Sequence, residues 1–474
     1  MNTASRIEPQ KKFVPMIQLN SVSVFNHNYR VFNSLDLRLE SGVSYLIKGS
    51  NGVGKTMLLK LIAGKIQPRK GIIKYNFIDD HLNWDEKYEL RKKYIHFVPT
   101  LALHDLISTP DLFYQQRYYT IESTPLTTVR DYLGERLNHP NLIQLPSTFQ
   151  LNHILDLELT HLSNGQLKKL IILKRLLDSI PHFLILDYPF EGLDVESRIE
   201  LRDFLDHLVS THQIQLIIAD NEHPQLPQSI TKTIILDKDR SLIISHTVAE
   251  HMSFGIETIP VPKIMESETV VELCEVKIKY GDKVILENVN WKINRGERWA
   301  LTGRNGSGKT TLFSLIYADH PLAYSEKVYL FGKRRGTGES IWDIKKRISY
   351  LGPEQFHFLD YTTEQLTVNE YLEKSSTGTK RLNDLIDFFQ LDELLFRKLM
   401  HLSNGQLQLI LLINLFSSQK ELLLLDEPFQ FLDPHYKKRV NDYLEMQLEE
   451  SVTMILITHY ANDVERWTNF RMTL

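Results

Sequence analysis

The segment Gly49-Ser-Asn-Gly-Val-Gly-Lys-Thr56 decides the fold of this chain, because it fits the pattern G-x-x-x-x-G-K-[ST] of a phosphate-binding loop. In such a loop the glycines let the backbone curl, so that successive N–H groups point at phosphate oxygens beside the N-terminus of the next helix. The pattern returns as Gly303-Arg-Asn-Gly-Ser-Gly-Lys-Thr310. One match alone could be a glycine-rich turn without a ligand, whereas two matches in corresponding places predict two such loops.

Two further motifs follow each loop in the same order. Leu162-Ser-Asn-Gly-Gln166 recurs word for word at Leu402 to Gln406. Phe183-Leu-Ile-Leu-Asp187 is matched by Leu422-Leu-Leu-Leu-Asp426, at nearly the same distance from the preceding motif. Agreement in both order and spacing indicates a chain built from two copies of one domain.

The length of the chain agrees with this duplication, because 474 residues exceed what one hydrophobic core usually supports. We predict a first domain at residues 16–246, a proline-containing linker at 247–269 and a second domain at 270–474. In each domain, short apolar strands alternate with longer helical patterns. This alternation predicts an α/β fold with a mainly parallel sheet covered on both faces, and a helical subdomain before the repeated Leu-Ser-Asn-Gly-Gln.

Composition narrows the class of protein further. The net charge is −4 without a long basic block, so there is no strong signal for nucleic-acid binding. The single cysteine, Cys274, cannot form an internal disulfide, which fits a reducing cytosol. Residues 1–15 lack the apolar core of a signal peptide, and no window approaches the ~20 apolar residues that span a membrane. We therefore expect a cytoplasmic protein, or one held at the inner face of the cell membrane by a partner.

The residues that end these motifs suit phosphate and magnesium chemistry. The lysine of each loop, Lys55 or Lys309, would neutralise the β- and γ-phosphates. The threonine after it and the aspartate at the end of each apolar strand would hold Mg²⁺. An apolar strand that ends in Asp is common in α/β proteins, so this assignment depends on the loops. The predicted Mg²⁺ ligands are Thr56, Asp187, Thr310 and Asp426.

The residue after the strand-end aspartate differs between the two halves. In the second half it is Glu427, whose carboxylate can orient and polarise an attacking water. In the first half it is Tyr188, and a phenol with an unperturbed pKa of about 10 is a poor base at neutral pH. General-base chemistry is therefore predicted in the second half only.

The repeated Leu-Ser-Asn-Gly-Gln is similar to the signature of the ABC ATPases, and Asp426-Glu-Pro428 resembles the end of their Walker B strand. Leu193-Asp194 and Leu432-Asp433 resemble the D-loop that follows, and Thr458-His459 resembles the switch histidine. The resemblance covers nearly the whole chain. It implies two P-loop NTPase domains, or cassettes, facing each other head to tail as an internal pseudo-dimer. Each ATP would be held by the Walker motifs of one cassette and the signature of the other.

The resemblance also assigns residues to the two composite sites. The aromatic residue that stacks on adenine is Tyr280 in the second half and Phe25 in the first, where the alignment needs a gap. The signature residues that would meet the γ-phosphate across the interface are Ser163, Gly165, Ser403 and Gly405. The loop residues expected to contact ATP are Gly49, Ser50, Asn51, Gly52, Val53, Gly54, Lys55 and Thr56 in the first half, and Gly303, Arg304, Asn305, Gly306, Ser307, Gly308, Lys309, Thr310 and Thr311 in the second.

Departures from the family pattern fall in the first half. Besides Tyr188, it has Asp220 at the place of the switch histidine, 33 residues after the strand-end aspartate in both halves (187 to 220 and 426 to 459). It also has Thr100 where a Q-loop glutamine is expected, whereas the second half offers Gln355 in a displaced position. An Asp near the γ-phosphate adds negative charge where charge accumulates. We therefore predict one competent site, with Lys309, Glu427 and His459 as its catalytic residues.

The segment 319–346 of the second half is similar to tandem ATPases of the ModF or PhrA family, described as molybdenum-transport or photorepair ATP-binding proteins. Four roles are open: energising subunit of a transporter with separate membrane subunits, translation factor, DNA-repair ATPase, and regulatory ATP sensor. The linker is too short for the charged helical linker of the translation factors, and no heptad run supplies the coiled coil of the repair ATPases. We favour the transporter subunit, with a soluble regulatory or repair-type ATPase as the alternative.

Overall fold

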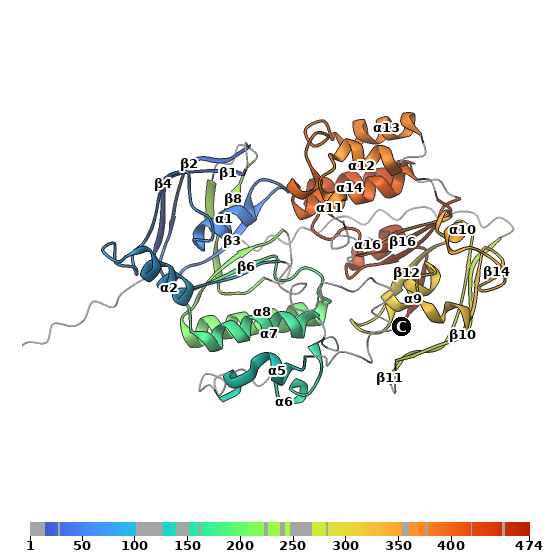
Figure 1. Ribbon diagram of the computed structural model, residues 1–474, viewed down its shortest axis with the longest axis horizontal. Helices are drawn as coiled ribbons and strands as arrows, with labels where there is room; N and C mark the ends of the chain where they lie inside the picture. Colours follow the sequence, from blue (N-terminus) through green and yellow to red (C-terminus); the bar gives the residue numbers. More distant parts are fainter. Residues whose placement is uncertain are drawn as a thin grey trace, which may run out of the picture. The chain divides into compact units, whose positions relative to one another are not determined.

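The computed structural model (Figure 1) describes residues 15–26, 29–100, 127–138, 151–159, 162, 164–221, 226–237, 242–246, 268–280, 283–352, 359, 361–375, 378–418, 420–447 and 451–474. The chain divides into two compact units, the first built mainly from residues up to Glu250 and the second mainly from those after it. The predicted linker at 247–269 lies almost entirely outside the described residues.

The first unit is built on a six-stranded sheet in the order β5-β6-β7-β3-β8-β9. Neighbouring strands are parallel from β5 to β8, and β9 is antiparallel to β8. Every residue of β6 and β7 is buried, as the near-continuous apolar runs predict for strands covered on both faces. The strands are β3 (Ser44–Gly49), β5 (Ile95–Val98), β6 (Phe183–Asp187), β7 (Gln215–Ala219), β8 (Ile230–Leu236) and β9 (Leu242–His246).

A smaller antiparallel sheet, in the order β2-β1-β4, packs with α1 against one face of this central sheet. In Figure 1, α7 and α8 lie on the opposite side of the central sheet. The strands are β1 (Ile17–Asn26), β2 (Tyr29–Leu39) and β4 (Lys70–Tyr75). The helices are α1 (Lys55–Ile62), α2 (Trp84–Tyr94), α5 (Val129–Leu133), η2 (Gly134–Asn138), α6 (Leu151–Ile154), α7 (Asn164–Asp178) and α8 (Val195–His212).

The second unit repeats this plan with a five-stranded parallel sheet in the order β15-β16-β17-β12-β18, and an antiparallel sheet in the order β11-β10-β13-β14. The strands are β10 (Thr269–Tyr280), β11 (Lys283–Asn294), β12 (Arg298–Thr302), β13 (Lys327–Leu330), β14 (Lys333–Arg334), β15 (Ile348–Leu351), β16 (Leu422–Asp426), β17 (Thr453–Ile457) and β18 (Phe470–Thr473). The helices are α9 (Lys309–Ile316), η6 (Pro321–Tyr324), α10 (Ile341–Lys345), α11 (Tyr361–Glu364), α12 (Val368–Ser375), α13 (Thr379–Phe389), η8 (Leu399–His401), α14 (Asn404–Ser417), α15 (Pro434–Gln447) and α16 (Ala461–Trp467). The predicted α/β fold is confirmed.

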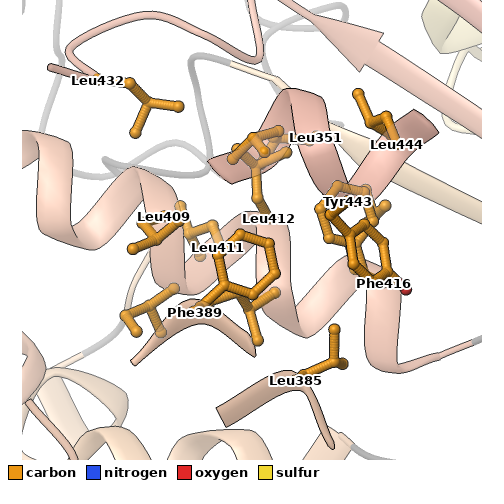
Figure 2. Packing of buried hydrophobic residues seen from close by; sticks show 14 of the residues in the cluster. Leu351, Leu385, Phe389, Leu409, Leu411, Leu412, Phe416, Leu432, Tyr443 and Leu444 are labelled. Carbon is orange, nitrogen blue, oxygen red and sulfur yellow. The ribbon is translucent and has the colours of Figure 1, made fainter. Parts of the chain in front are cut away.

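The core of the second unit explains why α14 is apolar on nearly all sides. Figure 2 shows side chains of α14, among them Leu412 and Phe416, packed with Phe389 of α13 and Tyr443 of α15. The rings of Phe416 and Tyr443 stack with centroids 4.6 Å apart. A helix enclosed in this way has no solvent face to which polar residues could be assigned. This buried helix begins at the signature motif.

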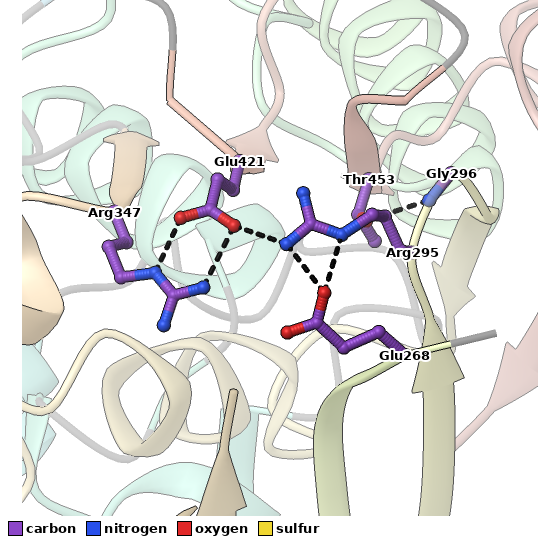
Figure 3. A network of polar contacts seen from close by, with 6 residues as sticks. All are labelled: Glu268, Arg295, Gly296, Arg347, Glu421 and Thr453. Atoms are coloured by element: carbon purple, nitrogen blue, oxygen red, sulfur yellow. Dashed lines mark hydrogen bonds and ion pairs between the residues drawn. The ribbon is translucent and has the colours of Figure 1, made fainter. Parts of the chain in front are cut away.

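An ion-pair network joins the starts of the central strands in the second unit (Figure 3). Glu421, just before β16, accepts hydrogen bonds from Arg347, just before β15, and from Arg295, just after β11. Arg295 also pairs with Glu268 at 2.9 Å. In the first unit, two stacked rings lie just before the corresponding strands, β5 and β6, in place of these ion pairs.

Those stacked rings belong to Tyr94 and His182, whose centroids are 4.6 Å apart. The backbone N–H of His182 donates to the Tyr94 carbonyl at 2.8 Å, as that of Glu421 does to Arg347 at 3.1 Å. The same backbone junction is thus made with two different side-chain chemistries.

Replacing Glu421 with Gln is expected to destabilise the second unit in a pH-dependent way. Hydrogen bonds from Arg347 and Arg295 outweigh burial and lower the pKa of Glu421 from 4.5 to about 2. A depressed carboxyl pKa stabilises the fold above the unfolded value, and this stabilisation is lost as pH falls from about 4.5 to about 2. With solvent screening we expect a loss of about 1–2 kcal/mol at neutral pH.

Urea unfolding at pH 7 and at pH 3 measures this effect. The difference between wild type and Glu421→Gln should shrink markedly at the lower pH. Glu275→Gln, which removes an exposed pair with Lys327, is the control and should change little at either pH. An equal difference between wild type and Glu421→Gln at the two pH values would contradict the assignment.

Candidate functional site

Each predicted phosphate-binding loop joins a central strand to the helix behind it. The first loop runs from β3 to α1, with Gly54 as the N-cap, and the second runs from β12 to α9, with Gly308 as the N-cap. Both glycines are left-handed, with φ of 115° and 95°. A Cβ at Gly308 would lie 2.7 Å from Cδ2 of Leu286, so glycine is needed there for space as well as conformation. No side chain caps either helix, and such termini present backbone N–H groups to an anion.

The loop lysines fold back over their own loops. Lys309 Nζ donates to the carbonyl oxygens of Gly303 and Arg304 at 2.8 and 2.9 Å. Lys55 Nζ donates in the same way to Gly49 and Ser50. Burial lowers the pKa of Lys309, against the opposing charge of nearby Asp426. Both ammonium groups therefore lie against the loops that are predicted to bind phosphate.

The predicted magnesium ligands meet in pairs, one pair in each unit. Thr56 Oγ1 donates to the Asp187 carboxylate at 3.0 Å, and Thr310 Oγ1 donates to Asp426 at 3.1 Å. Burial raises the pKa of Asp187 to about 6, although hydrogen bonds from Thr56 and Thr100 oppose the shift. A hydroxyl and a carboxylate oxygen at the end of a loop that binds phosphate suit Mg²⁺, which takes oxygen ligands.

The residue after each of these aspartates has the same backbone in both units. Tyr188 and Glu427 each have φ of 51°, and each N–H donates at 2.9 Å to a carbonyl of the next strand. The side chains differ in chemistry. Glu427 Oε1 lies 3.5 Å from Nε2 of His459, whereas the Tyr188 ring centre lies 5.7 Å from Lys55 Nζ. The second unit thus brings together a carboxylate and an imidazole, and the first brings a phenol to its loop lysine.

Asp220, predicted at the place of the switch histidine, follows β7 and is fully buried. Its carboxylate accepts the N–H of Asn221 at 2.7 Å, and its own N–H donates to Ile47 at 3.2 Å. His459 follows β17 in the second unit. The two residues thus follow corresponding strands, with an acid in one unit and an imidazole in the other.

The signature serine of the second unit begins α14. The Ser403 hydroxyl accepts the N–H of Gln406 at 3.3 Å, and the Gln406 side chain accepts the Ser403 N–H at 3.1 Å. This reciprocal capping fixes the start of the helix, with Gly405 buried in its first turn. Gly165 is buried in the first turn of α7, and Ser163 lies outside the described residues.

The predicted adenine-stacking residues are described to different extents. Phe25, near the end of β1, has the Arg69 guanidinium 5.0 Å from its ring centre. Tyr280 ends β10, and its side chain lies outside what the structure describes, as does Gln355.

One pair of site residues was missed by the sequence reasoning. Lys168 Nζ donates to the carbonyl of Pro189 at 2.7 Å, and Gln408 Nε2 donates to that of Pro428 at 2.8 Å. Both donors stand five residues after their signature serines (163 to 168 and 403 to 408), on α7 and α14. They tie the signature helix to the turn after the strand-end aspartate. Their matching place in the repeat was the available signal, but the change from Lys to Gln concealed it.

Comparison with known proteins identifies the class. The family profile described as ABC transporter matches residues 32–191 and 286–430, which together make up more than half of the chain. The chain belongs to the ABC transporter family and carries its ATP-binding cassette twice, as the sequence resemblance predicted. Membership implies ATP binding and, in general, ATP hydrolysis.

Two relatives are similar over almost their full lengths. The chain is 29% identical to the ABC transporter ATP-binding protein ModF of Escherichia coli (strain K12) over 492 residues, covering 96% of each chain. It is 27% identical to the uncharacterized ABC transporter ATP-binding protein C323.04 of Schizosaccharomyces pombe, covering 96% of this chain and 97% of the relative. The expected similarity to ModF is confirmed.

Solved structures share the fold at lower identity. Archaeal ABCE1 from a structure of ribosome-bound Pelota and ABCE1 matches with a TM-score of 0.59 and 21% identity, over 90% of this chain and 71% of that one. The complex of archaeal ribosomal stalk protein aP1 with ribosome recycling factor aABCE1 matches with a TM-score of 0.56 and 19% identity, over 96% and 87%. Within the described residues, no helix is long and apolar enough to cross a membrane.

Proposed function

We propose that this tandem ABC ATPase hydrolyses ATP at only one of two composite sites and energises a separate integral-membrane subunit. The proposal of a single hydrolytic site is carried by one observation. Glu427 pairs with His459, beside Asp426 and Thr310. The corresponding positions of the first unit hold Tyr188 and Asp220, on the same backbone framework. The asymmetry therefore concerns the groups that act on the water and the γ-phosphate.

At the competent site, the residues of the second cassette divide the work of hydrolysis. Lys309 neutralises the phosphates, Glu427 orients and polarises the attacking water, and His459 contacts the γ-phosphate as charge develops on it. Thr310 and Asp426 would hold Mg²⁺, which would supply further charge neutralisation. The signature of the first cassette, Ser163 and Gly165, completes the site from the other side. Tyr280 stacks on the adenine.

At the other site, the same loop chemistry binds ATP without turning it over at a comparable rate. Lys55, Thr56 and Asp187 hold the phosphates and Mg²⁺, and Ser403 and Gly405 close the site. A phenol is a poor base at neutral pH, because the unperturbed pKa of tyrosine is about 10. Phe25 provides the adenine contact, and the bound ATP acts as a clamp between the cassettes.

The transport role rests on the family and on the similarity to ModF, whose name describes an ABC transporter ATP-binding protein. We propose that the chain works in the cytoplasm, at the inner face of the cell membrane. ATP-driven closure of the two cassettes would move the membrane subunit, and release of products would reopen them. The alternative is a soluble regulatory or repair-type ATPase without such a subunit.

Co-purification from detergent-solubilised membranes distinguishes these roles. The full chain carrying Glu427→Gln, which should hold ATP without hydrolysis, is the bait, and Lys55→Ala with Lys309→Ala is the control that should not bind ATP. A stoichiometric integral-membrane protein on the bait, reduced on the control, is the expected result. Recovery with ribosomes or DNA, lost steeply as salt is added, would contradict the transport role and support the alternative.

A further inference from the structure

Lys437, on α15, lies at the junction of three segments of the second unit. Its ammonium group pairs with both carboxylate oxygens of Asp463 on α16, at 2.8 and 2.9 Å. The same Nζ atom lies 5.3 Å from the ring centre of Phe429 and 4.9 Å from that of Tyr460. One cation therefore contacts an acid and two aromatic faces at once.

The three partners of Lys437 stand next to the proposed catalytic residues. Phe429 comes two residues after Glu427, and Tyr460 comes directly after His459. Asp463 lies in the first turn of α16, whose N-cap is Tyr460. The side chain thus connects the segment that carries the general base to the segment that carries the switch histidine.

The switch segment is short and held at both ends. It begins where the buried strand β17 ends at Ile457, and it ends at the start of α16. The N–H of Tyr460 donates to Thr458 Oγ1 at 3.2 Å, and that of Asp463 donates to the Tyr460 carbonyl at 3.1 Å. A shift of the first turn of α16 would therefore displace His459 directly.

The two members of the Lys437–Asp463 ion pair are buried to different extents. Only 4% of the Asp463 side chain is exposed, against 31% of that of Lys437. Burial raises the pKa of Asp463, and the charge of Lys437 opposes that shift. Removal of Lys437 would leave a buried carboxylate without its cation, which is costly unless the segment moves toward water.

We propose that Lys437 is a positioning residue for ATP hydrolysis, holding the Glu427 turn and the His459 segment in register through Phe429, Tyr460 and Asp463. This inference rests on the proposed function of the second site. It assigns Lys437 no contact with ATP.

In the first unit, the two corresponding positions hold different residues. Counting from the D-loop aspartates (433 to 437 and 194 to 198), the position of Lys437 is taken by Arg198, which is buried. Counting from the switch positions (459 to 463 and 220 to 224), the position of Asp463 is taken by Pro224, outside the described residues. A proline has no carboxylate to pair with a cation. A lysine and an aspartate at these two positions thus occur in the half of the sequence that also has the glutamate and the histidine.

Three variants of the full chain test the role of the bridge. Lys437→Met removes the charge and keeps the stem, Asp463→Asn removes the partner charge, and Lys437→Arg keeps a cation. Lys438→Met is the matched control, since the Lys438 side chain is 77% exposed and pairs with Asp442 on the same helix. Turnover is measured with the KM for ATP, ATP affinity and the unfolding temperature. Glu427→Gln is measured alongside.

We expect Lys437→Met and Asp463→Asn each to lower kcat at least about tenfold, because a displacement of about 1 Å can cost ~100-fold. The KM and the ATP affinity should change little, because Lys309 and the loop are untouched. The unfolding temperature of Lys437→Met should fall, because the buried Asp463 carboxylate loses its cation, whereas Asp463→Asn removes that charge and should change it less. Lys437→Arg should recover most of the rate. The double variant Lys437→Met/Asp463→Asn should be no slower than the slower single variant, because both remove the same bridge.

The alternative outcomes separate this inference from the proposed function. Wild-type kcat in Lys437→Met, with turnover abolished by Glu427→Gln, would overturn the positioning role and leave the proposed function standing. A fall in kcat matched by an equal loss of ATP affinity in both single variants would also overturn it, because the bridge would then be a general structural contact. A Glu427→Gln variant as active as wild type would overturn the proposed function, and the positioning role with it.

Discussion

Glu427→Gln is expected to abolish most ATP turnover while leaving ATP binding intact. The amide keeps the size of the side chain but cannot accept a proton from water, and general-base catalysis contributes about 10²–10⁴-fold. Binding should persist because Lys309, Thr310 and Asp426 form their contacts without Glu427. Steady-state phosphate release and equilibrium binding of ATP measure the two effects separately.

Tyr188→Phe is the matched control for this prediction. Tyr188 has the same backbone conformation as Glu427, so the two changes probe equivalent places in the two units. Loss of the Tyr188 hydroxyl keeps the ring near Lys55 and should change turnover by less than about twofold. Comparable losses from the two changes would contradict the asymmetric mechanism, because both sites would then contribute to hydrolysis.

A gain of ATPase activity is expected when the first unit is given the catalytic groups that it lacks. In a chain already carrying Glu427→Gln, the further changes Tyr188→Glu and Asp220→His should raise turnover at least about tenfold, because they supply the missing general base and imidazole. The φ of 51° at both Tyr188 and Glu427 indicates that a glutamate at position 188 would leave its strand as Glu427 does. Thr100, in place of a Q-loop glutamine, should keep the restored rate below that of the wild type.

The control for this gain replaces Tyr188 with Gln instead of Glu, again with Asp220→His and Glu427→Gln. It has the same shape and lacks only the carboxylate. Phosphate release by the two chains, compared at saturating ATP, isolates the contribution of the new base. Equal rates would mean that the first site is limited by something other than Tyr188 and Asp220, and would contradict our account of the asymmetry.

Local motifs explain why much of the fold and site was predictable from sequence. The two loops predicted a strand, a turn and a helix at each site, and the structure has β3 to α1 and β12 to α9 there. The apolar runs that end in Asp187 and Asp426 predicted buried parallel strands, which β6 and β16 are. Such motifs carry their information within a few residues, because backbone conformation and hydrophobic burial both act locally.

Contacts between distant segments were not predictable in the same way. The pair Lys437–Asp463 joins two residues that are 26 positions apart, on two different helices, and neither residue belongs to a recognisable motif. The junction before the central strands contains the ion pair Arg347–Glu421 in the second unit and the stacked rings of Tyr94 and His182 in the first. Because the residue types differ, comparing the two halves of the sequence did not reveal this junction. These side chains acquire their roles only when tertiary packing brings the strand starts or helices together.

On our proposal, the two halves bind ATP alike and differ in the chemistry that follows. The most direct test is to mix the wild-type chain with labelled ATP and Mg²⁺, quench the mixture within the time of one turnover, and count the bound nucleotides. We predict two nucleotides per chain, one recovered as ADP and the other still as ATP. Recovery of two ADP per chain, formed at similar rates, would contradict the account.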